Sequence, residues 1–263
     1  MSWYTGDPFY DTVLLVGLVI PLATVLVSRF VSAPYGRFGG QWPLPKLHAK
    51  WGWILMELPA TLVFWPAFLT GPRSGWTVPT IIAGIWGIHY LNRGFIFPSL
   101  LRVPKGSRTF SIVVVVTGMF VTALHGYLHG FFIARYGDHL TDAWLSDSRF
   151  WVGLGLYLAG LVLNIHSDSV LRALRTPQEV QRGDKIYRMP RRGGFIFVTN
   201  PQYLGELTAW VGFAMLTWSL AGVVILAISA ANLIPRAIAT HKWYRDRFPD
   251  YPRARKILIP FIF

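Results

Sequence analysis

Long apolar runs, separated by short polar segments, extend along almost the whole chain. Each run approaches the roughly 20 residues that an α-helix needs to cross the hydrocarbon core of a bilayer. The pattern predicts an all-α fold, an integral membrane bundle of seven transmembrane helices in a single domain, residues 1–263. The fifth and sixth runs are short for a span and are compatible with tilted helices. The predicted spans are Thr12–Phe30, Trp51–Leu69, Val78–Phe97, Ser111–Ile133, Phe150–Ile165, Leu204–Trp218 and Leu220–Ile238.

The loops between the predicted spans alternate in charge. Lysine and arginine gather in the cytosolic loops of membrane proteins. The alternation therefore predicts a multi-pass protein with its N-terminus outside or lumenal and its C-terminus in the cytosol. We expect it in a bacterial inner membrane or, in a eukaryote, in the endoplasmic reticulum. The basic segments are residues 32–50, 98–110 and 166–203 and the tail after residue 238, whereas the loop 134–149 holds Asp138, Asp142 and Asp147.

Polar residues interrupt the apolar runs near one membrane face. Ionisable groups are costly in hydrocarbon and persist there mainly when they face a bundle interior or a wet cavity. With the predicted topology, all of them lie towards the cytosolic side, which indicates one polar site that opens to the cytosol. These residues are Glu57, Tyr90, Arg93, Asn164, His166, Asp168, Glu206, Arg236 and His241.

Composition narrows the class of protein further. The 263 residues are 53% hydrophobic and 16% aromatic, with a mean hydropathy of +0.41, which is too apolar for an ordinary soluble domain. The net charge of +13 sits in short loops, which favours membrane orientation and anionic ligands, and we expect no nucleic-acid partner. The absence of cysteine excludes disulfides, thiolate catalysis and cysteine-ligated zinc. Met1–Asp11 has no Lys or Arg and does not resemble a cleaved signal peptide.

Two stretches have the chemistry of a nucleotide site. Asn164–Asp168 supplies an amide, an imidazole and a carboxylate, which can bind sugar hydroxyls or a carboxamide; the alternative is a helix cap at the interface. Arg188–Phe195 combines guanidinium groups with glycines, which suits phosphate. On that stretch alone a solvated basic loop is the stronger interpretation. The chain has no Walker motif, and no GxGxxG follows a predicted strand.

Glu57 and Tyr90 are candidates for carbonyl recognition. A buried glutamate that carries or shares a proton can donate a hydrogen bond to a carbonyl oxygen, and a tyrosine phenol can share that task. The alternative for Glu57 is a structural pair with Arg93. His125 and His129 have the i, i+4 spacing of metal ligands, but no third ligand is evident, so we interpret them as structural and expect no metal.

Several segments together resemble one known family, the steroid 5α-reductases (3-oxo-5α-steroid 4-dehydrogenases). The resemblance extends from about Tyr35 to Phe263, and the compact loops suggest a bacterial homologue. Its strongest parts are Asp250–Phe263, Asn164–Asp168 and His241–Tyr244, and its weaker parts are Tyr35–Gly39, His89–Tyr90, Gly193–Phe195 and Tyr203–Glu206.

The resemblance implies a membrane oxidoreductase that reduces the 4,5 double bond of 4-ene-3-oxo steroids by hydride transfer from NADPH and gives 5α-dihydro steroids. By position, Glu57 and Tyr90 would hold the steroid 3-keto oxygen. Residues 12–133 would form mainly the steroid or lipid pocket and residues 150–263 mainly the cofactor half. We expect a steroid or related lipid substrate, contact with membrane lipid, and a monomer. The expected cofactor-binding residues are Arg37, Asn164, His166, Asp168, Arg175, Tyr187, Arg188, Gln202, Glu206, Arg236, His241 and Tyr244.

Three alternatives remain at this point. Membrane methyltransferases that use S-adenosylmethionine share a similar C-terminal helical region, but the Glu57 and Tyr90 pair favours reduction. A reductase of another lipid enone or enal, such as a polyprenol or enoyl-CoA substrate, is a second alternative. A lipid carrier without chemistry is a third, although the basic loops and the lack of an inverted repeat favour a nucleotide enzyme.

The chain departs from the family pattern at Met56, at Arg102–Lys105 and at Ala209.

Overall fold

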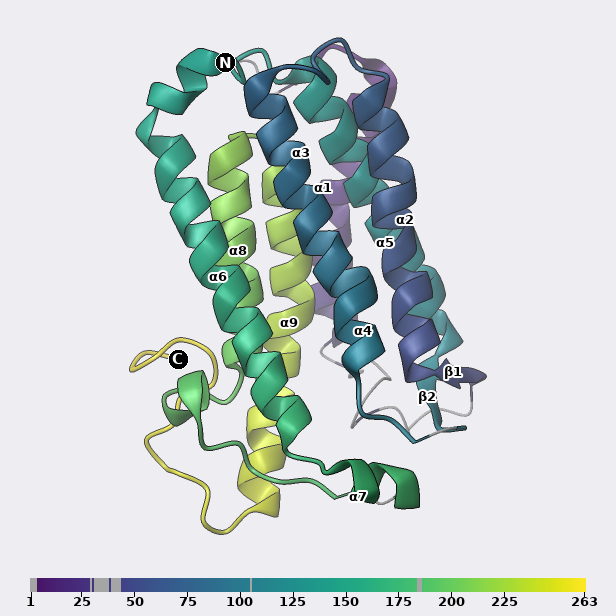
Figure 1. The fold of residues 1–263 in the computed structure, drawn as a ribbon, viewed down its shortest axis with the longest axis vertical. Helices are drawn as coiled ribbons and strands as arrows, with labels where there is room; N and C mark the ends of the chain where they lie inside the picture. The colour runs from purple at the N-terminus through teal and green to yellow at the C-terminus, as the bar shows by residue number, and fades with distance from the viewer. Residues whose placement is uncertain (1–3, 29, 31–37, 39–43, 105, 184–185) are drawn as a thin grey trace.

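The computed structural model describes residues 4–28, 30, 38, 44–104, 106–183 and 186–263. Long helices stand side by side in one bundle (Figure 1). Short elements connect them, most of them at the end of the bundle that also carries a small sheet. The long helices are α1 (Pro8–Ser28), α2 (Ala49–Leu69), α3 (Thr77–Tyr90), α5 (Ile112–Phe131), α6 (Ser148–Ala173), α8 (Pro201–Thr217) and α9 (Leu220–Arg247), and the short ones are α4 (Phe97–Leu100) and α7 (Pro177–Arg182).

Five helical segments in the described part of the chain are long and apolar enough to cross a membrane. The predicted membrane-helix class is therefore confirmed, whereas the number seven is not. Two of the predicted spans are not among the five. The third predicted span is helical from residue 77 to residue 100, but a π-helix at Leu91–Ile96 divides it. The sixth corresponds to α8, which has only 17 residues. The five segments are α1, α2, Ile112–Tyr136, α6 and α9.

Two features differ from the sequence prediction. Helix α6 continues to Ala173, beyond the predicted end at Ile165, because the polar residues that follow keep a helical backbone. Its first turn is capped by Asp147, whose Oδ1 accepts a hydrogen bond of 2.8 Å from the Arg149 amide.

The fold is also not purely helical. Strands β1 (Lys46–His48) and β2 (Arg108–Ser111) pair antiparallel and join two of the basic segments.

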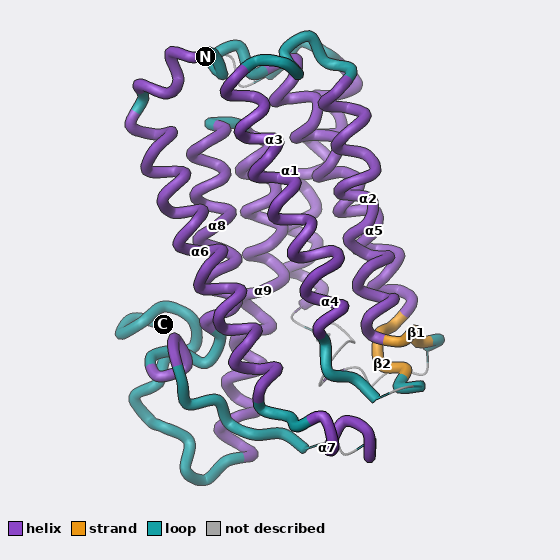
Figure 2. Tube along the Cα trace, in the orientation of Figure 1, coloured by secondary structure: helices purple, strands orange, loops and turns teal. Residues whose placement is uncertain are grey.

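Figure 2 shows that β1, β2, α7 and the tail after α9 gather at one end of the bundle, which we call the sheet end. The turn between α8 and α9 and the loop between α2 and α3 lie at the opposite end, which we call the far end. Trp218 ends α8 there in a left-handed conformation with φ of 43°.

Glycines set the distance between α6 and α8. A Cβ atom on Gly205 would lie 2.5 Å from the amide nitrogen of Asn164, and one on Gly153 would lie 2.7 Å from that of Leu216. Gly160 and Gly212 face the opposite backbone in the same way. Lipid gives no hydrophobic force between helices, so close backbone packing at small residues drives their association.

Aromatic side chains fill the centre of the bundle. The Trp86 ring stacks on Phe64 with centroids 4.9 Å apart and lies 4.8 Å from the His129 ring. The indole nitrogen of Trp86 donates to the carbonyl of Ala60 at 3.2 Å. These contacts join α3 to α2 and α5, and the His129 Nδ1 is bonded to the His125 carbonyl at 2.8 Å. The two histidines thus pack inside the bundle, as the structural interpretation expects.

We predict that Gly160→Leu destabilises the protein by about 1–3 kcal/mol, since a side chain at this position would collide with the α8 backbone. Gly155→Leu is the matched control, because a Cβ atom there meets nothing within 4 Å. Thermal unfolding in detergent measures both variants. Equal midpoints for the two would contradict the close packing of α6 on α8.

Candidate functional site

Buried polar side chains from four helices meet in the half of the bundle nearer the sheet end. Glu206 lies at the centre of one group. Its Oε2 accepts a hydrogen bond from Asn164 Nδ2 at 3.0 Å, and its Oε1 accepts one from Trp210 Nε1 at 3.0 Å. His89 Nε2 lies 3.5 Å from the same Oε1. Asn164 Nδ2 also donates to the Gln202 carbonyl at 2.9 Å, which fixes the amide between α6 and α8.

Arg93 forms the second group, in which one guanidinium faces two carboxylates. Its Nε lies 4.0 Å from Glu57 Oε1, and its NH1 lies 3.8 Å from Asp168 Oδ2. The guanidinium is 4.6 Å from the Trp53 ring centre and 5.1 Å from that of Phe97. The pairing of Glu57 with Arg93, the structural alternative, is therefore present. Both distances exceed a charge-assisted hydrogen bond of about 2.7–2.9 Å, so either carboxylate can also accept a ligand donor.

Tyr90 is buried in the same region. Its ring lies 4.7 Å from Trp86 and 5.2 Å from His89. The π-helix that follows Tyr90 brings Gly94 against Glu57, where a Cβ atom would lie 3.4 Å from the Glu57 Cβ. The two predicted carbonyl-binding residues are thus both buried, and the segment that directly follows Tyr90 packs against Glu57.

A separate cluster lies where the tail meets α9. Thr199 Oγ1 is hydrogen-bonded to His241 Nδ1 at 2.6 Å and to the Tyr251 hydroxyl at 2.5 Å. Burial raises the pKa of Tyr251. Burial also lowers the pKa of Arg255, whose guanidinium lies 5.2 Å from the Tyr251 ring centre. The tail thereby holds His241 in place.

Further predicted cofactor residues lie near this cluster and along the loop that precedes it. Arg236 Nε donates to the Tyr203 hydroxyl at 2.9 Å. Tyr244 is buried and its ring stacks on Tyr251, with centroids 6.3 Å apart. Trp243 packs against Tyr187 at 5.1 Å, and Arg175 lies 5.6 Å from the Tyr187 ring centre.

Two of the predicted residues that the structure describes are exposed and lie outside the buried groups, and a third falls outside the described residues. Arg188 is exposed and pairs with Glu179; hydrogen bonds from Arg188 lower the pKa of Glu179 to about 2. His166 is exposed, and its ring lies next to Gly193. It follows the buried Asn164 by two positions on α6, so its side chain points about 200° away from that of Asn164 around the helix axis. Arg37 lies outside the described residues.

Some buried polar atoms of the described residues have no hydrogen-bond partner. They include Gln202 Oε1, Ser167 Oγ and His89 Nδ1, all on helices that carry the Glu206 group. A buried polar group without a partner is uncommon in a folded protein and calls for an explanation such as a ligand. The donor and acceptor set fits the carboxamide and ribose of a nicotinamide nucleotide. Among the described residues, no three His, Asp or Glu side chains are grouped to hold a metal.

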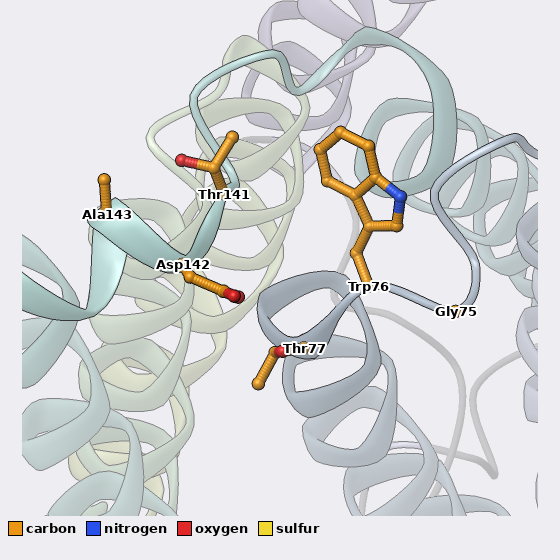
Figure 3. Close-up of a pocket in the computed structure, with 6 residues that line it drawn as sticks. All are labelled: Gly75, Trp76, Thr77, Thr141, Asp142 and Ala143. Carbon is orange, nitrogen blue, oxygen red and sulfur yellow. The ribbon is translucent and has the colours of Figure 1, made fainter.

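Two cavities open at the far end, away from these groups. The first has a volume of about 500 Å³, and Figure 3 shows Trp76 and Thr77 at the start of α3 opposite Thr141 and Asp142. The second has a volume of about 620 Å³ and includes Arg135 and Trp218 in its wall. None of the predicted site residues lines either cavity, so the polar groups, and not these cavities, define the candidate site.

Several residues of the site were not predicted from the sequence. His89, Trp210, Thr199 and Tyr251 all bond to predicted residues. A histidine next to Tyr90 in an apolar run is a signal that could have identified His89, by the reasoning applied to Glu57. Tyr251 lies within Asp250–Phe263, one of the strongest parts of the family resemblance, whereas Trp210 had no signal, since aromatic residues are abundant in the chain.

Comparison with known proteins identifies the family. A profile described as 3-oxo-5-alpha-steroid 4-dehydrogenase matches residues 108–263. The 3-oxo-5-alpha-steroid 4-dehydrogenase 1 of Rattus norvegicus is 37% identical over 243 residues, which cover 91% of this chain and 90% of the relative. The steroid 5-alpha-reductase DET2 of Solanum lycopersicum is 32% identical over 265 residues, 98% of this chain and 99% of the relative. The 3-oxo-5-alpha-steroid 4-dehydrogenase 2 of Sus scrofa is 38% identical over 221 residues, with 83% and 82% covered.

The chain belongs to the 3-oxo-5-alpha-steroid 4-dehydrogenase family. The family resemblance is thus confirmed, but these relatives are eukaryotic and give no support to the suggestion of a bacterial homologue. All predicted cofactor residues except Arg37 lie within the stretch that the family profile matches, whereas Glu57 and Tyr90 precede it.

For this family member we predict that Glu206→Gln lowers the free energy of unfolding by about 1.5–3 kcal/mol, the range for a buried hydrogen bond to a charged group. The new amide would turn its NH₂ towards one of the two donors, Asn164 or Trp210. Unfolding in detergent measures the effect. Glu179→Gln, which breaks an exposed ion pair, is the control and should change little. Equal losses for both variants would contradict the central role of Glu206.

Proposed function

We propose that this chain reduces the 4,5 double bond of 4-ene-3-oxo steroids with NADPH and releases 5α-dihydro steroids. The names of its relatives support the reaction class. The observation that carries the proposal is the burial of a carboxyl and a phenol, Glu57 and Tyr90, beside the hydrogen-bonded group of Asn164 and Glu206. A pair that can bind a carbonyl, next to an amide and a carboxylate that can bind a nicotinamide nucleotide, suits the reduction of an enone.

Glu57 and Tyr90 would bind the steroid 3-keto oxygen. Reduction of an enone develops negative charge on that oxygen, and donors aimed at it stabilise the transition state. The phenol donates directly, and Glu57 takes part by sharing a proton with the phenol or with the oxygen. Arg93 faces Glu57 at 4.0 Å and would position its carboxyl group. Its cation would be held in turn by Asp168 and the Trp53 ring.

The cofactor would occupy the side of this group nearer the tail. Gln202 Oε1 and Ser167 Oγ lack partners in the described part of the chain and, with Asn164 and Asp168, offer hydrogen bonds to a carboxamide or ribose. Guanidinium groups suit the phosphates. Bound NADPH would supply the hydride that reduces the steroid at C5, and the resulting enolate would take a proton from water at C4. The residues proposed to contact it are Arg37, Asn164, His166, Asp168, Arg175, Tyr187, Arg188, Gln202, Glu206, Arg236, His241 and Tyr244.

We further propose seven spans with the sheet end in the cytosol. The continuous helical stretch 77–100 and α8, which packs along α6, would add two spans to the five. Residues 12–133 would form mainly the lipid-accessible steroid pocket and residues 150–263 mainly the cofactor half. The protein would act as a monomer.

We predict that purified protein oxidises NADPH with testosterone or progesterone and prefers NADPH strongly over NADH. Arginines near the site suit the 2′-phosphate that distinguishes NADPH. The assay follows cofactor absorbance and product stereochemistry. A polyprenal and an enoyl thioester are run in parallel, with S-adenosylmethionine as a test of methyl transfer. Exclusive turnover of the polyprenal or the thioester, methyl transfer, or equal kcat/KM with NADH and NADPH would overturn the corresponding part of the proposal.

We predict that Glu57→Gln and Tyr90→Phe each lower kcat on the order of 10²-fold, as for the loss of one donor to an oxyanion. Both side chains act on one oxygen, so the double variant should be little worse than the worse single variant. Steady-state kinetics on a 4-ene-3-oxo steroid test this, with unfolding and NADPH binding measured separately. Near-wild-type turnover of Glu57→Gln with reduced stability would assign Glu57 a purely structural role beside Arg93.

We predict that reporters inserted at Asp138 and attached at Phe263 lie on opposite sides of the membrane. With seven spans, three of them (α6, α8 and α9) separate the two positions, and the alternating loop charge predicts the same arrangement. Protease protection in sealed vesicles provides an independent measurement. Reporters on the same side would contradict the topology while leaving the reaction untouched.

A further inference from the structure

An apolar surface with no protein partner among the described residues lies between the tail and the segment before α8. Phe261 is 81% exposed and Ile262 is 77% exposed. Other large apolar side chains surround them, and contiguous exposed apolar surface of this kind marks an interaction site. We call this surface the tail patch; it consists of Ile196, Phe197, Ile259, Phe261, Ile262 and Phe263.

The tail patch is built on an ordered backbone. The main-chain oxygen of Phe263 accepts hydrogen bonds from the amides of Leu258 at 2.7 Å and Ile259 at 2.6 Å, which closes a tight loop. Phe261 has a φ of 66°, an unfavourable backbone conformation for a bulky residue. The Phe197 and Phe261 rings meet at 5.8 Å. An ordered, strained loop that leaves its aromatic side chain outside the protein core indicates an external partner.

The tail patch lies at the depth of a membrane-crossing helix. A Cβ atom on Gly194 would be 3.3 Å from the Leu163 side chain, which places the segment before Phe197 against α6. Leu163 is 15 residues after Ser148, about 22 Å along a helix that is long enough to cross a bilayer. Beside it, Val162 and Ile165 are exposed apolar residues. Figure 1 shows the tail turning back from the sheet end to the height of the lower part of α6.

Basic residues accompany the tail patch in the sequence. Arg192 precedes Ile196, and Arg253 and Lys256 precede Ile259; both arginines are exposed. Lys256 pairs with Val198 in a parallel bridge, which ties the two segments of the patch together. Segments that lie in the headgroup region of anionic membranes typically combine apolar side chains with flanking lysine and arginine.

We infer that the tail patch is seated in the bilayer leaflet at the sheet end, with lipid acyl chains and headgroups as its partner. The tail after α9 therefore returns to the membrane surface instead of standing in the aqueous phase. Lipid contact on one side and the hydrogen bonds of Thr199 and Tyr251 to His241 on the other would hold the tail against α9. The inference concerns lipid contact and does not depend on the proposed reaction.

The chain has no cysteine, so single cysteines report one position each. Phe261→Cys and Ile262→Cys are labelled with a nitroxide and the full chain is reconstituted in vesicles of phosphatidylcholine and phosphatidylglycerol. Relaxation by oxygen, which concentrates in lipid, is compared with relaxation by a water-soluble nickel chelate. Val162→Cys on α6 is the lipid control, and Arg182→Cys at the end of α7 is the aqueous control, both at exposed positions.

We expect both tail labels to favour oxygen over the nickel chelate by a ratio close to that of Val162→Cys and at least several-fold above that of Arg182→Cys. A ratio equal to that of Arg182→Cys would overturn the inference. Low access to both reagents, with dipolar broadening between labels, would also overturn it and would identify a second copy of the chain as the partner. The two neighbouring positions guard against misfolding of either variant.

Discussion

Helices α6 and α8 approach each other so closely at Gly160 and Gly205 that neither glycine has space for a side chain. This contact determines where the polar residues of the two helices meet. A Cβ atom on Gly205 would lie 2.5 Å from the Asn164 amide nitrogen, and the Asn164 side chain lies 3.0 Å from the carboxylate of Glu206, one residue further along α8. A wider spacing would separate this pair, remove one donor from Glu206 and take both acceptors away from the Asn164 amide nitrogen, at a cost that a lipid-embedded protein cannot recover from water.

The buried polar groups in turn couple the helices. Glu206 is bonded to Asn164 of α6 and faces His89 of α3, and Arg93 faces carboxylates of α2 and α6. Removing one partner from such a group leaves a buried charge without a counter-charge. This destabilises the protein more than replacing both partners by apolar residues would. Stability and site geometry therefore rest on the same contacts. Among the described residues, nearly all of the buried charge therefore lies in the half of the bundle nearer the sheet end. Aromatic side chains around Trp86 pack beside it.

The sequence predicts where the long helices and several of the buried polar side chains lie, but it does not predict the structure of the loops. Apolar length predicts each long helix that the structure describes, and the cost of polar and charged groups in hydrocarbon singles out Glu57, Asn164 and Glu206, all of which are buried. It does not predict that Arg188 pairs with Glu179 or that His166 faces outwards, since pairing in loops and rotation about α6 depend on neighbours distant in sequence. Strands β1 and β2 are short and join segments about 60 residues apart. His89 was accessible to the same reasoning as Glu57.

The most direct test of this account is NADPH affinity after the smallest possible change at the α6–α8 contact. Gly205→Ala adds one methyl group against the Asn164 backbone, and Gly155→Ala adds the same group where nothing lies within 4 Å. If this contact sets the site, the Kd for NADPH is raised about tenfold or more in folded Gly205→Ala protein, equivalent to about 1.4 kcal/mol, and is unchanged in Gly155→Ala. Wild-type affinity in a folded Gly205→Ala variant would contradict the claim that this contact sets the site.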